Sequence, residues 1–256
     1  MRLFRIVMLL LLLVVIGAGV FFWRLPADVG YRYGVKRAGA VALSGLRGTV
    51  WDGHADGISL LGSDLGEVDW HLPKLSLLGG KPLVDVRIKG SGVEVAGQVE
   101  RLGRGIFDAH DLRFSVPAST FEPLLANQGL KLGGTVSGVL EDASLSSFSL
   151  QQAKGNARWS GVVVTSADGE LRTADLLADF DTLPGGGVGG TLKDDGGGNL
   201  AIDGRFSLRV PMFEVQATLR ARNGDEQTLA FLRGIGEPQP DGSTIVRAQG
   251  SMLSVH

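Results

Sequence analysis

The chain lacks cysteine and contains few histidines, and both facts exclude kinds of chemistry. With no cysteine there is no disulfide, no thiolate nucleophile and no cysteine-based zinc site. The body must therefore be held by an ordinary hydrophobic core, which about 230 residues can supply. None of the four histidines lies four residues from another histidine, as a zincin-type metal site requires, and we expect solvated surface positions for them: His54 in a turn, His71 beside a strand end, His110 and His256.

Catalytic motifs are also missing. The stretch GSDLG (62–66) has its serine at the wrong position for a nucleophile elbow. The glycine-rich stretch 183–199 lacks the Gly-Lys-Ser/Thr ending of a phosphate loop, so it is predicted to be a hairpin or loop. Asp175, Asp179 and Asp181 are acid–base candidates, but paired carboxylates need a cleft that the sequence does not indicate. We therefore predict a protein that is not an enzyme and has no catalytic residue, cofactor or metal.

The charge balance argues against a nucleic-acid partner. The formal net charge is −2, and acidic and basic residues are scattered along the chain. A nucleic-acid-binding protein would be expected to show a basic patch or stripe.

A long apolar run near the N-terminus indicates a membrane segment. Residues 6–23 carry no charge, and a helix of this length spans roughly 27 Å, close to the ~30 Å hydrocarbon core of a bilayer. The alternative is a cleaved signal peptide with a cleavage site at Gly17-Ala18-Gly19, but the apolar run continues past it to Trp23. We predict a cytoplasmic tail (1–5), an uncleaved anchor (6–23) and export of the remaining chain.

Glycine is abundant, and it separates short stretches of alternating apolar and polar residues. There are 39 glycines among 256 residues. An apolar–polar period of two is typical of half-buried strands. Such stretches occur at 84–88, 93–99, 201–210, 213–222 and 244–250. Turn signals between them predict a mainly antiparallel β-sheet body.

Capping signals predict three short helices within this β body. Ser119 and Glu122 have the spacing of a capping box, and Gly129 can end that helix. A second helix is predicted from Asp225 to Gly234, and a weaker one within 26–39.

Three short motifs recur in the same order roughly 90 residues later, which suggests a duplicated unit. The pairs are Leu25–Asp28 with Val116–Ser119, Leu46–Val50 with Leu132–Val136, and Gly66–Trp70 with Gly155–Trp159. We therefore predict a first periplasmic β repeat over 24–115 and a second, with a C-terminal extension, over 116–256.

The tryptophans are the candidate anchors of the core or of an interface. Trp51, Trp70 and Trp159 lie on or beside predicted strands, where a large aromatic residue usually packs in a core. The alternative is an exposed apolar surface for a partner or an acyl chain. Glycines such as Gly48 and Gly53 are expected at turns, at bulges or where Trp51 packs closely.

Taken together, several segments resemble the protein N family of the type II secretion system. They are the N-terminal anchor, the motif Gly48-Thr49-Val50-Trp51 with Gly53, the stretch LGEVDW (65–70) and a following LP-LSLLGG segment. Asp52 departs from the neutral polar residue expected there. The resemblance implies a single-pass inner-membrane protein with a periplasmic β domain, accessory to the machine that moves folded proteins across the outer membrane. It implies no catalytic residues.

The leading hypothesis is therefore a non-enzymatic subunit that contacts other inner-membrane and periplasmic components of that machine through strand edges or apolar faces. The alternative hypothesis is a periplasmic lipid-binding or lipid-transfer module with a curved apolar β groove. An uncovered apolar face across several adjacent strands would favour the alternative.

Overall fold

The computed structural model describes residues 24–31, 41–60, 63–74, 76, 82–103, 106–122, 129–146, 149–166, 169–224 and 226–251. The predicted tail (1–5) and membrane anchor (6–23) lie outside the described residues. Among the residues that are described, no helix is long and apolar enough to cross a membrane.

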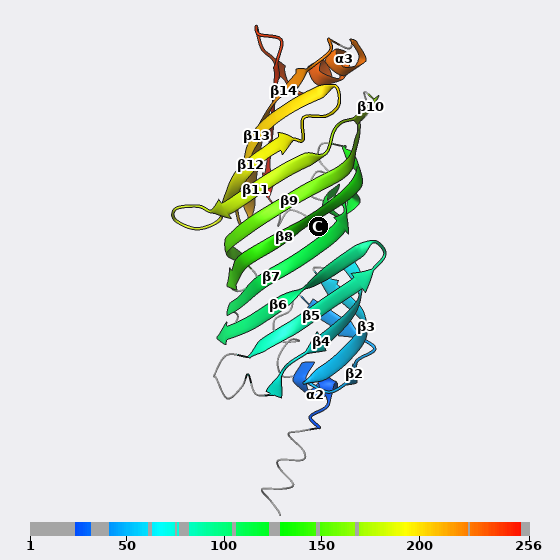
Figure 1. The fold of residues 1–256 in the computed structure, drawn as a ribbon, viewed down its shortest axis with the longest axis vertical. Helices are drawn as coiled ribbons and strands as arrows, with labels where there is room; N and C mark the ends of the chain where they lie inside the picture. Colours follow the sequence, from blue (N-terminus) through cyan, green and yellow to red (C-terminus); the bar gives the residue numbers. More distant parts are fainter. Residues whose placement is uncertain are drawn as a thin grey trace, which may run out of the picture.

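The described chain forms one elongated 16-stranded sheet in which sequence neighbours are almost always spatial neighbours (Figure 1). The strand order is β1-β3-β4-β5-β6-β7-β8-β9-β11-β12-β13-β14-β16-β15, with β2 paired to β3 and β10 to β9. The strands are β1 (Val41–Ser44), β2 (Arg47–Gly48), β3 (Asp52–Leu60), β4 (Ser63–His71), β5 (Leu83–Gly90), β6 (Val93–Gly103), β7 (Ile106–Pro117), β8 (Lys131–Ser146), β9 (Ser149–Ser166), β10 (Gly169–Arg172), β11 (Leu176–Thr182), β12 (Val188–Asp194), β13 (Leu200–Arg209), β14 (Met212–Ala221), β15 (Glu237–Pro238) and β16 (Thr244–Ser251). The prediction of a mainly antiparallel β body is confirmed.

The five predicted strands are found within a residue or a few of their expected ends, as β5, β6, β13, β14 and β16. The proposed boundary between repeats falls near the end of β7. Strands β7 and β8 pair from Ile106↔Ser146 to Pro117↔Thr135, so the sheet runs through that boundary without a break.

Strand register gives the sheet one apolar face and one polar face. A single row on the apolar face crosses twelve strands: Ala55, Val68, Ile88, Val95, Phe114, Gly138, Ala157, Ala178, Leu192, Gly204, Ala217 and Val246. The neighbouring row lies on the polar face: His54, Asp69, Arg87, Ala96, Arg113, Val139, Asn156, Asp179, Thr191, Arg205, Gln216 and Arg247. The period-two pattern of the sequence is thus one continuous division of the whole sheet.

The apolar face carries two buried clusters. The first lies under the helix α3 (Glu226–Ile235), where Leu232 packs with residues of β9 and β11–β14 such as Leu176, Leu200 and Leu219. The second is centred on Ala109, Ala143, Ala153 and Val188. Outside these clusters much of the apolar face is half-buried, as β5 illustrates with Val84, Val86 and Ile88.

Helices are few. Helix α2 (Ala27–Gly30) is a single turn, and residues 118–122 form a 3₁₀ turn where the helix with the Ser119–Glu122 capping box was predicted to begin. The predicted continuation over 123–128 lies outside the described residues. The predicted C-terminal helix is confirmed as α3, but it continues through Gly234 to Ile235 and ends before Gly236.

The glycine-rich stretch 183–199 is not one loop. Its first glycines form the tight β11–β12 turn, in which Gly186 donates to the carbonyl of Leu183, and β12 follows from Val188 to Asp194. The second part connects β12 to β13.

That second part is held by an ion pair between Asp194 and Arg222. The Asp194 side chain is 7% exposed and lies 2.5 Å from Nη2 of Arg222. It also accepts hydrogen bonds from the backbone N–H groups of Ile202 (2.7 Å) and Gly196 (2.9 Å). Burial alone would raise the pKa of Asp194, but these donors and the Arg222 guanidinium outweigh it and lower the pKa.

We expect the substitution Asp194→Ala to lower the free energy of unfolding by about 3 kcal/mol, because it leaves Nη2 of Arg222 and the Ile202 N–H without their acceptor. Urea unfolding of the full chain in detergent, followed by tryptophan fluorescence, measures this loss. The matched control is Asp203→Ala, an exposed aspartate on β13, which should change stability by less than about 0.5 kcal/mol. Because the folded pKa of Asp194 is depressed, its contribution is present above the unfolded pKa and is lost as pH falls through the folded pKa. Equal losses in both variants would contradict this role.

Candidate interaction surface

The Gly-Thr-Val-Trp motif forms the tight connection between β2 and β3. Gly48 has a φ of +80°, which favours glycine, and starts the turn. The Thr49 hydroxyl accepts hydrogen bonds from the N–H groups of Trp51 (3.2 Å) and Asp52 (3.1 Å). The Trp51 side chain is 2% exposed, so it lies in the core.

The same motif ties the N-terminal segment to the sheet. Val50 donates a backbone hydrogen bond to the carbonyl of Leu25 (2.9 Å), and Pro26 forms an isolated antiparallel bridge with Thr49. Leu72, just after β4, donates to the carbonyl of Trp51 (2.6 Å). The motif therefore joins the chain entering from the N-terminus to the β1–β4 end of the sheet.

Trp70 explains the second glycine of the motif. It lies on β4 opposite Gly53 of β3, and its indole Nε1 donates to the carbonyl of Val50 (3.2 Å). A Cβ on Gly53 would overlap the six-membered ring of Trp70, so only glycine fits beneath the indole.

The second set of motifs repeats this geometry. Trp159 on β9 donates from Nε1 to the carbonyl of Gly133 (2.9 Å), next to Gly134, whose φ is +97°. Pro117 pairs with Thr135, as Pro26 does with Thr49. These contacts agree with a duplicated unit, although the division into 24–115 and 116–256 stays a prediction.

Histidine–carboxylate pairs characterise the N-terminal half of the polar face. Nδ1 of His54 lies 2.8 Å from Asp69, and Nδ1 of His110 lies 2.8 Å from Asp142. His71 pairs in the same way with Asp52. The prediction of a turn at His54 is wrong, because this residue lies within β3.

The pKa of His54 is raised. The hydrogen bond that His54 donates to Asp69 is the largest cause; desolvation opposes it, and Asp56 adds to the increase. The Arg47 guanidinium, 2.7 Å from both carboxylate oxygens of Asp56, in turn lowers the pKa of that carboxyl. This corner of the polar face is therefore a small network of alternating charges.

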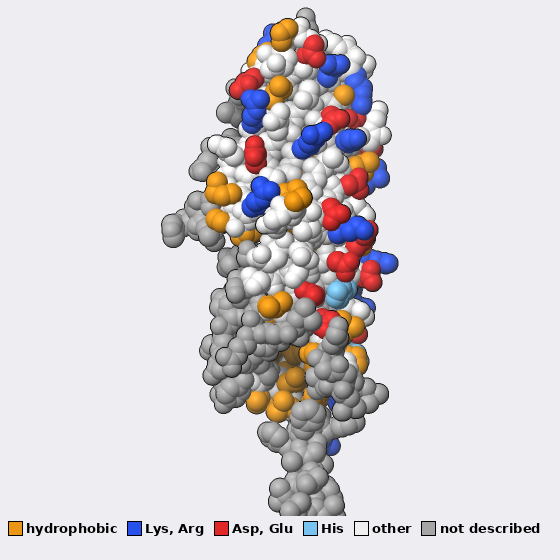
Figure 2. Space-filling view, turned by 90° about the vertical axis from the view of Figure 1, so that its left-hand side faces the viewer, with side chains coloured by type: hydrophobic (Ala, Val, Ile, Leu, Met, Phe, Trp, Pro, Cys, Tyr) orange, Lys and Arg blue, Asp and Glu red, His pale blue; other side chains and the backbone are white. Residues whose placement is uncertain are grey.

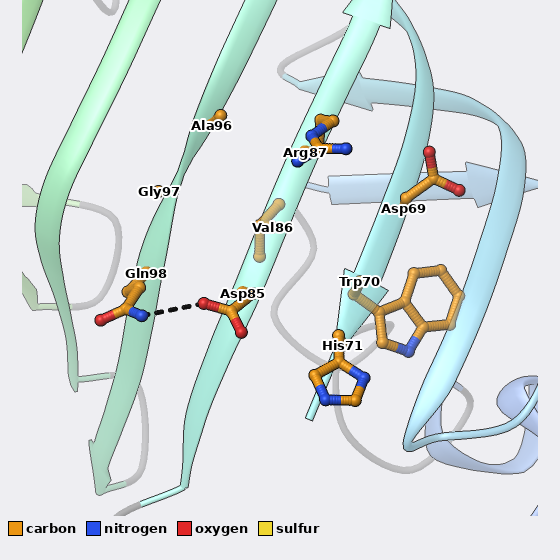
Figure 3. Close-up of a pocket in the computed structure, with 9 residues that line it drawn as sticks. All are labelled: Asp69, Trp70, His71, Asp85, Val86, Arg87, Ala96, Gly97 and Gln98. Atoms are coloured by element: carbon orange, nitrogen blue, oxygen red, sulfur yellow. Dashed lines mark hydrogen bonds between the residues drawn. The ribbon is translucent and has the colours of Figure 1, made fainter. Parts of the chain in front are cut away.

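A shallow hollow lies beside this network, with a volume of about 410 Å³ (Figure 3). On the polar face it is bordered by Asp69, His71, Asp85, Arg87 and Gln98, and Gln98 donates to Asp85 (2.9 Å). Ala96 leaves the space open between larger neighbours. Four of the groups bordering the hollow form hydrogen bonds across strands, namely Asp69, His71, Asp85 and Gln98, which suits a contact surface better than a reaction site.

A second hollow of about 550 Å³, here called the central hollow, lies on the polar face over β7, β8, β9 and β11. Its polar-face lining includes Arg113, Val139, Asn156, Arg158, Leu177 and Asp179. Leu177 is 37% exposed, so an apolar side chain is presented between its cross-strand neighbours Arg158 on β9 and Lys193 on β12. Figure 2 shows acidic and basic side chains interspersed along one long side of the molecule.

The acid–base candidates do not form a catalytic arrangement among the described residues. Asp175 binds Arg158 (2.9 Å) and the N–H of Gly161 (3.1 Å), which lower its pKa. Asp179 and Asp181 lie exposed at alternate positions of β11. Within the described ranges no group of three or more His, Asp or Glu side chains is arranged to hold a metal ion.

Sequence reasoning missed the cross-strand histidine pairs and the exposed Leu177. The period-two pattern can place His54, Asp69 and Leu177 on the polar face. It cannot show that His54 lies opposite Asp69, because that follows from the register in which β3 and β4 pair. Leu177 interrupts the alternation beside Leu176, and that doubled leucine was the available signal.

Comparison with known proteins identifies related chains. A model of the family "Type II secretion system (T2SS), protein N" matches residues 39–247, more than half of the chain. The type II secretion system protein N of Vibrio cholerae serotype O1 (strain ATCC 39315 / El Tor Inaba N16961) is 28% identical over 214 residues, covering 78% of this chain and 80% of that protein. No solved structure matches the chain.

We expect Gly53→Ala to destabilise the protein by about 2 kcal/mol, because the new methyl group must displace the Trp70 ring. The control is Gly57→Ala in the same strand, where the new methyl group meets the movable Ser44 hydroxyl. Urea unfolding of the full chain in detergent should separate the two variants. If both unfold at the same denaturant concentration, close packing of Trp70 on Gly53 is not the constraint.

We expect Asp69→Asn to lower the pKa of His54, measured by the pH titration of histidine Cε1–H signals in NMR spectra of the full chain. Asp85→Asn, which leaves both carboxylate partners of His54 in place, should leave that titration unchanged. Since the folded pKa is raised, the pair stabilises the protein fully below the unfolded pKa of about 6.5 and loses this contribution as pH rises through the folded pKa. An unchanged pKa of His54 in the Asp69→Asn variant would show that Asp69 does not raise this pKa.

Proposed function

The chain belongs to the type II secretion system protein N family and is thus a component of that system; on this premise we propose that it is a non-enzymatic subunit that assists export through protein–protein contacts. The export that it would assist is the transport of folded proteins across the outer membrane. The family match over most of the β body is the observation that carries the proposal.

The proposed location is the inner membrane, with a single span over residues 6–23 and the β body in the periplasm. The uncharged apolar run supports this location. The described chain begins beside α2 at the β1–β4 end of the sheet, where the Gly-Thr-Val-Trp motif binds it (Figure 1). An anchor preceding α2 would place that end nearest the membrane and extend the sheet away from it.

The central hollow is the proposed surface for contact with another component of the system. Leu177 presents apolar area that a partner would bury, and arginine is enriched at protein interfaces. Charged groups of both signs around it would favour one orientation of a partner over others. Trp51 is buried and therefore serves the core, whereas Trp70 and Trp159 are half-buried beneath the sheet surface.

A second candidate function is lipid binding, with the apolar face as the binding surface. The specific observation in its favour is the row of apolar residues that crosses twelve strands while much of that face, as in β5, is only half-buried. Acyl chains are apolar and flexible, so a long face of valine, leucine and alanine would suit them.

Photocrosslinking in cells that carry the complete secretion system tests both functions. A photoreactive amino acid replaces Leu177 on the polar face, Val86 on the apolar face, or the exposed control Asp203, and each variant is checked for secretion of a cargo enzyme. We expect a discrete protein adduct at Leu177 that is absent at Asp203 and disappears when the other secretion components are deleted.

The lipid function instead predicts adducts to phospholipid at Val86, detected by mass spectrometry, with no protein adduct at Leu177. Absence of adducts at both positions in secretion-competent cells would count against the central hollow and the apolar face alike.

A further inference from the structure

The last long strand of the sheet has an open edge. β16 pairs with β14 over all of Thr244–Ser251, but it pairs with β15 only at Thr244 and Ile245. Among the described residues no strand pairs with the other edge of β16 from Val246 to Ser251. In the described part of the chain, the backbone of these six residues therefore has no strand paired to it on this edge.

The hairpin before β16 shows which backbone groups point to this edge. Gln239 donates to the carbonyl of Ser243 (2.8 Å), so the Ser243 carbonyl faces the β15 side. Because hydrogen-bonding direction alternates along an antiparallel strand, the N–H and C=O groups of Arg247 and Gln249 face the same side. Those of Val246, Ala248 and Gly250 face β14.

The open edge lacks the usual features that prevent pairing. In natural proteins, lysines, prolines, bulges or a very short length prevent an edge strand from pairing with a strand of another molecule. Pro238 protects β15, yet the exposed part of β16 reads Val-Arg-Ala-Gln-Gly and has no lysine or proline. Its pairing with β14 is regular, without a bulge.

We propose that this edge binds the same edge of a second copy of the chain, so that two β16 strands pair antiparallel about a two-fold axis. The two strands can form hydrogen bonds only in registers where the edge-facing backbone groups of one copy, such as those of Arg247 and Gln249, lie opposite edge-facing groups of the other copy. A register centred on Arg247 sets two arginines opposite each other, which is unfavourable. Centring on Ala248 instead places Arg247 opposite Gln249 of the second copy and Ala248 opposite itself.

Side chains fit this register on both faces of the sheet. On the apolar face Val246 would lie opposite Gly250, where the Phe213 ring already occupies the space that a Cβ would need. On the polar face each Arg247, held 2.9 Å from Glu237 of its own chain, would face a neutral glutamine. The apolar faces of the two copies would become one continuous surface.

A single cysteine tests this pairing, because the natural chain has none. Residues facing each other in a non-hydrogen-bonded antiparallel pair have Cα atoms about 4.5 Å apart, within the range of disulfides. Ala248→Cys, oxidised with copper–phenanthroline in membranes, should give a disulfide-linked dimer on non-reducing gels. Ala178→Cys, on the same face of the interior strand β11 and equally half-buried, should stay monomeric.

A second variant distinguishes pairing from random collision. Gln249→Pro removes an N–H that faces the open edge but none that faces β14, so it should abolish the Ala248→Cys crosslink while the far-ultraviolet circular dichroism is retained. Light scattering of the wild-type chain in detergent should give twice the monomer mass of 26.9 kDa. A monomeric wild-type mass, or crosslinking that is the same at positions 178 and 248, would overturn the proposal.

Discussion

Backbone pairing between consecutive antiparallel strands is the interaction on which the rest of this structure depends. No disulfide holds the chain, and in the described part α3 is the one helix longer than a turn. Because side chains alternate between faces, a one-residue slip in any pair would move apolar residues to the polar face. The register is kept from β3 to β16, and the local shifts in β3–β4, β6–β7 and β8–β9 occur without exchanging the faces.

The two faces meet different physical demands. The polar face satisfies its charges across strands, through pairs such as His54–Asp69 and Arg158–Asp175, and leaves shallow hollows where small residues lie between larger ones. The apolar face is fully buried in two places: under α3, and at the cluster formed by Ala109, Ala143, Ala153 and Val188. Elsewhere much of it is only half-buried. Among the described residues, α3 is the helix that packs against one of the buried clusters of this face.

The similar contacts of Trp70 and Trp159 stabilise two different places in the sheet. At each site an indole N–H donates to a backbone carbonyl close to a glycine of positive φ: the acceptor Val50 lies two residues after Gly48, and the acceptor Gly133 directly precedes Gly134. A Pro–Thr pair lies next to each site. The first site joins the N-terminal segment to the sheet, and the second lies in the middle of the sheet. The same local chemistry thus serves as an attachment in one place and as an interior brace in the other.

The sequence by itself predicted five of the strands and the family, excluded cysteine chemistry and indicated a membrane segment that stays a prediction, because period-two alternation, composition and a long apolar stretch are local properties. It also singled out Gly53 and Trp51, but it did not show that Trp70, rather than Trp51, is what excludes a side chain at Gly53. Only the tertiary structure decided which strands are neighbours, that His54 faces Asp69, that Leu177 is exposed between Arg158 and Lys193, and that no other described strand covers most of the outer edge of β16. The physical reason is that register, bulges and edges arise from pairing between segments far apart in the chain, which no local pattern specifies.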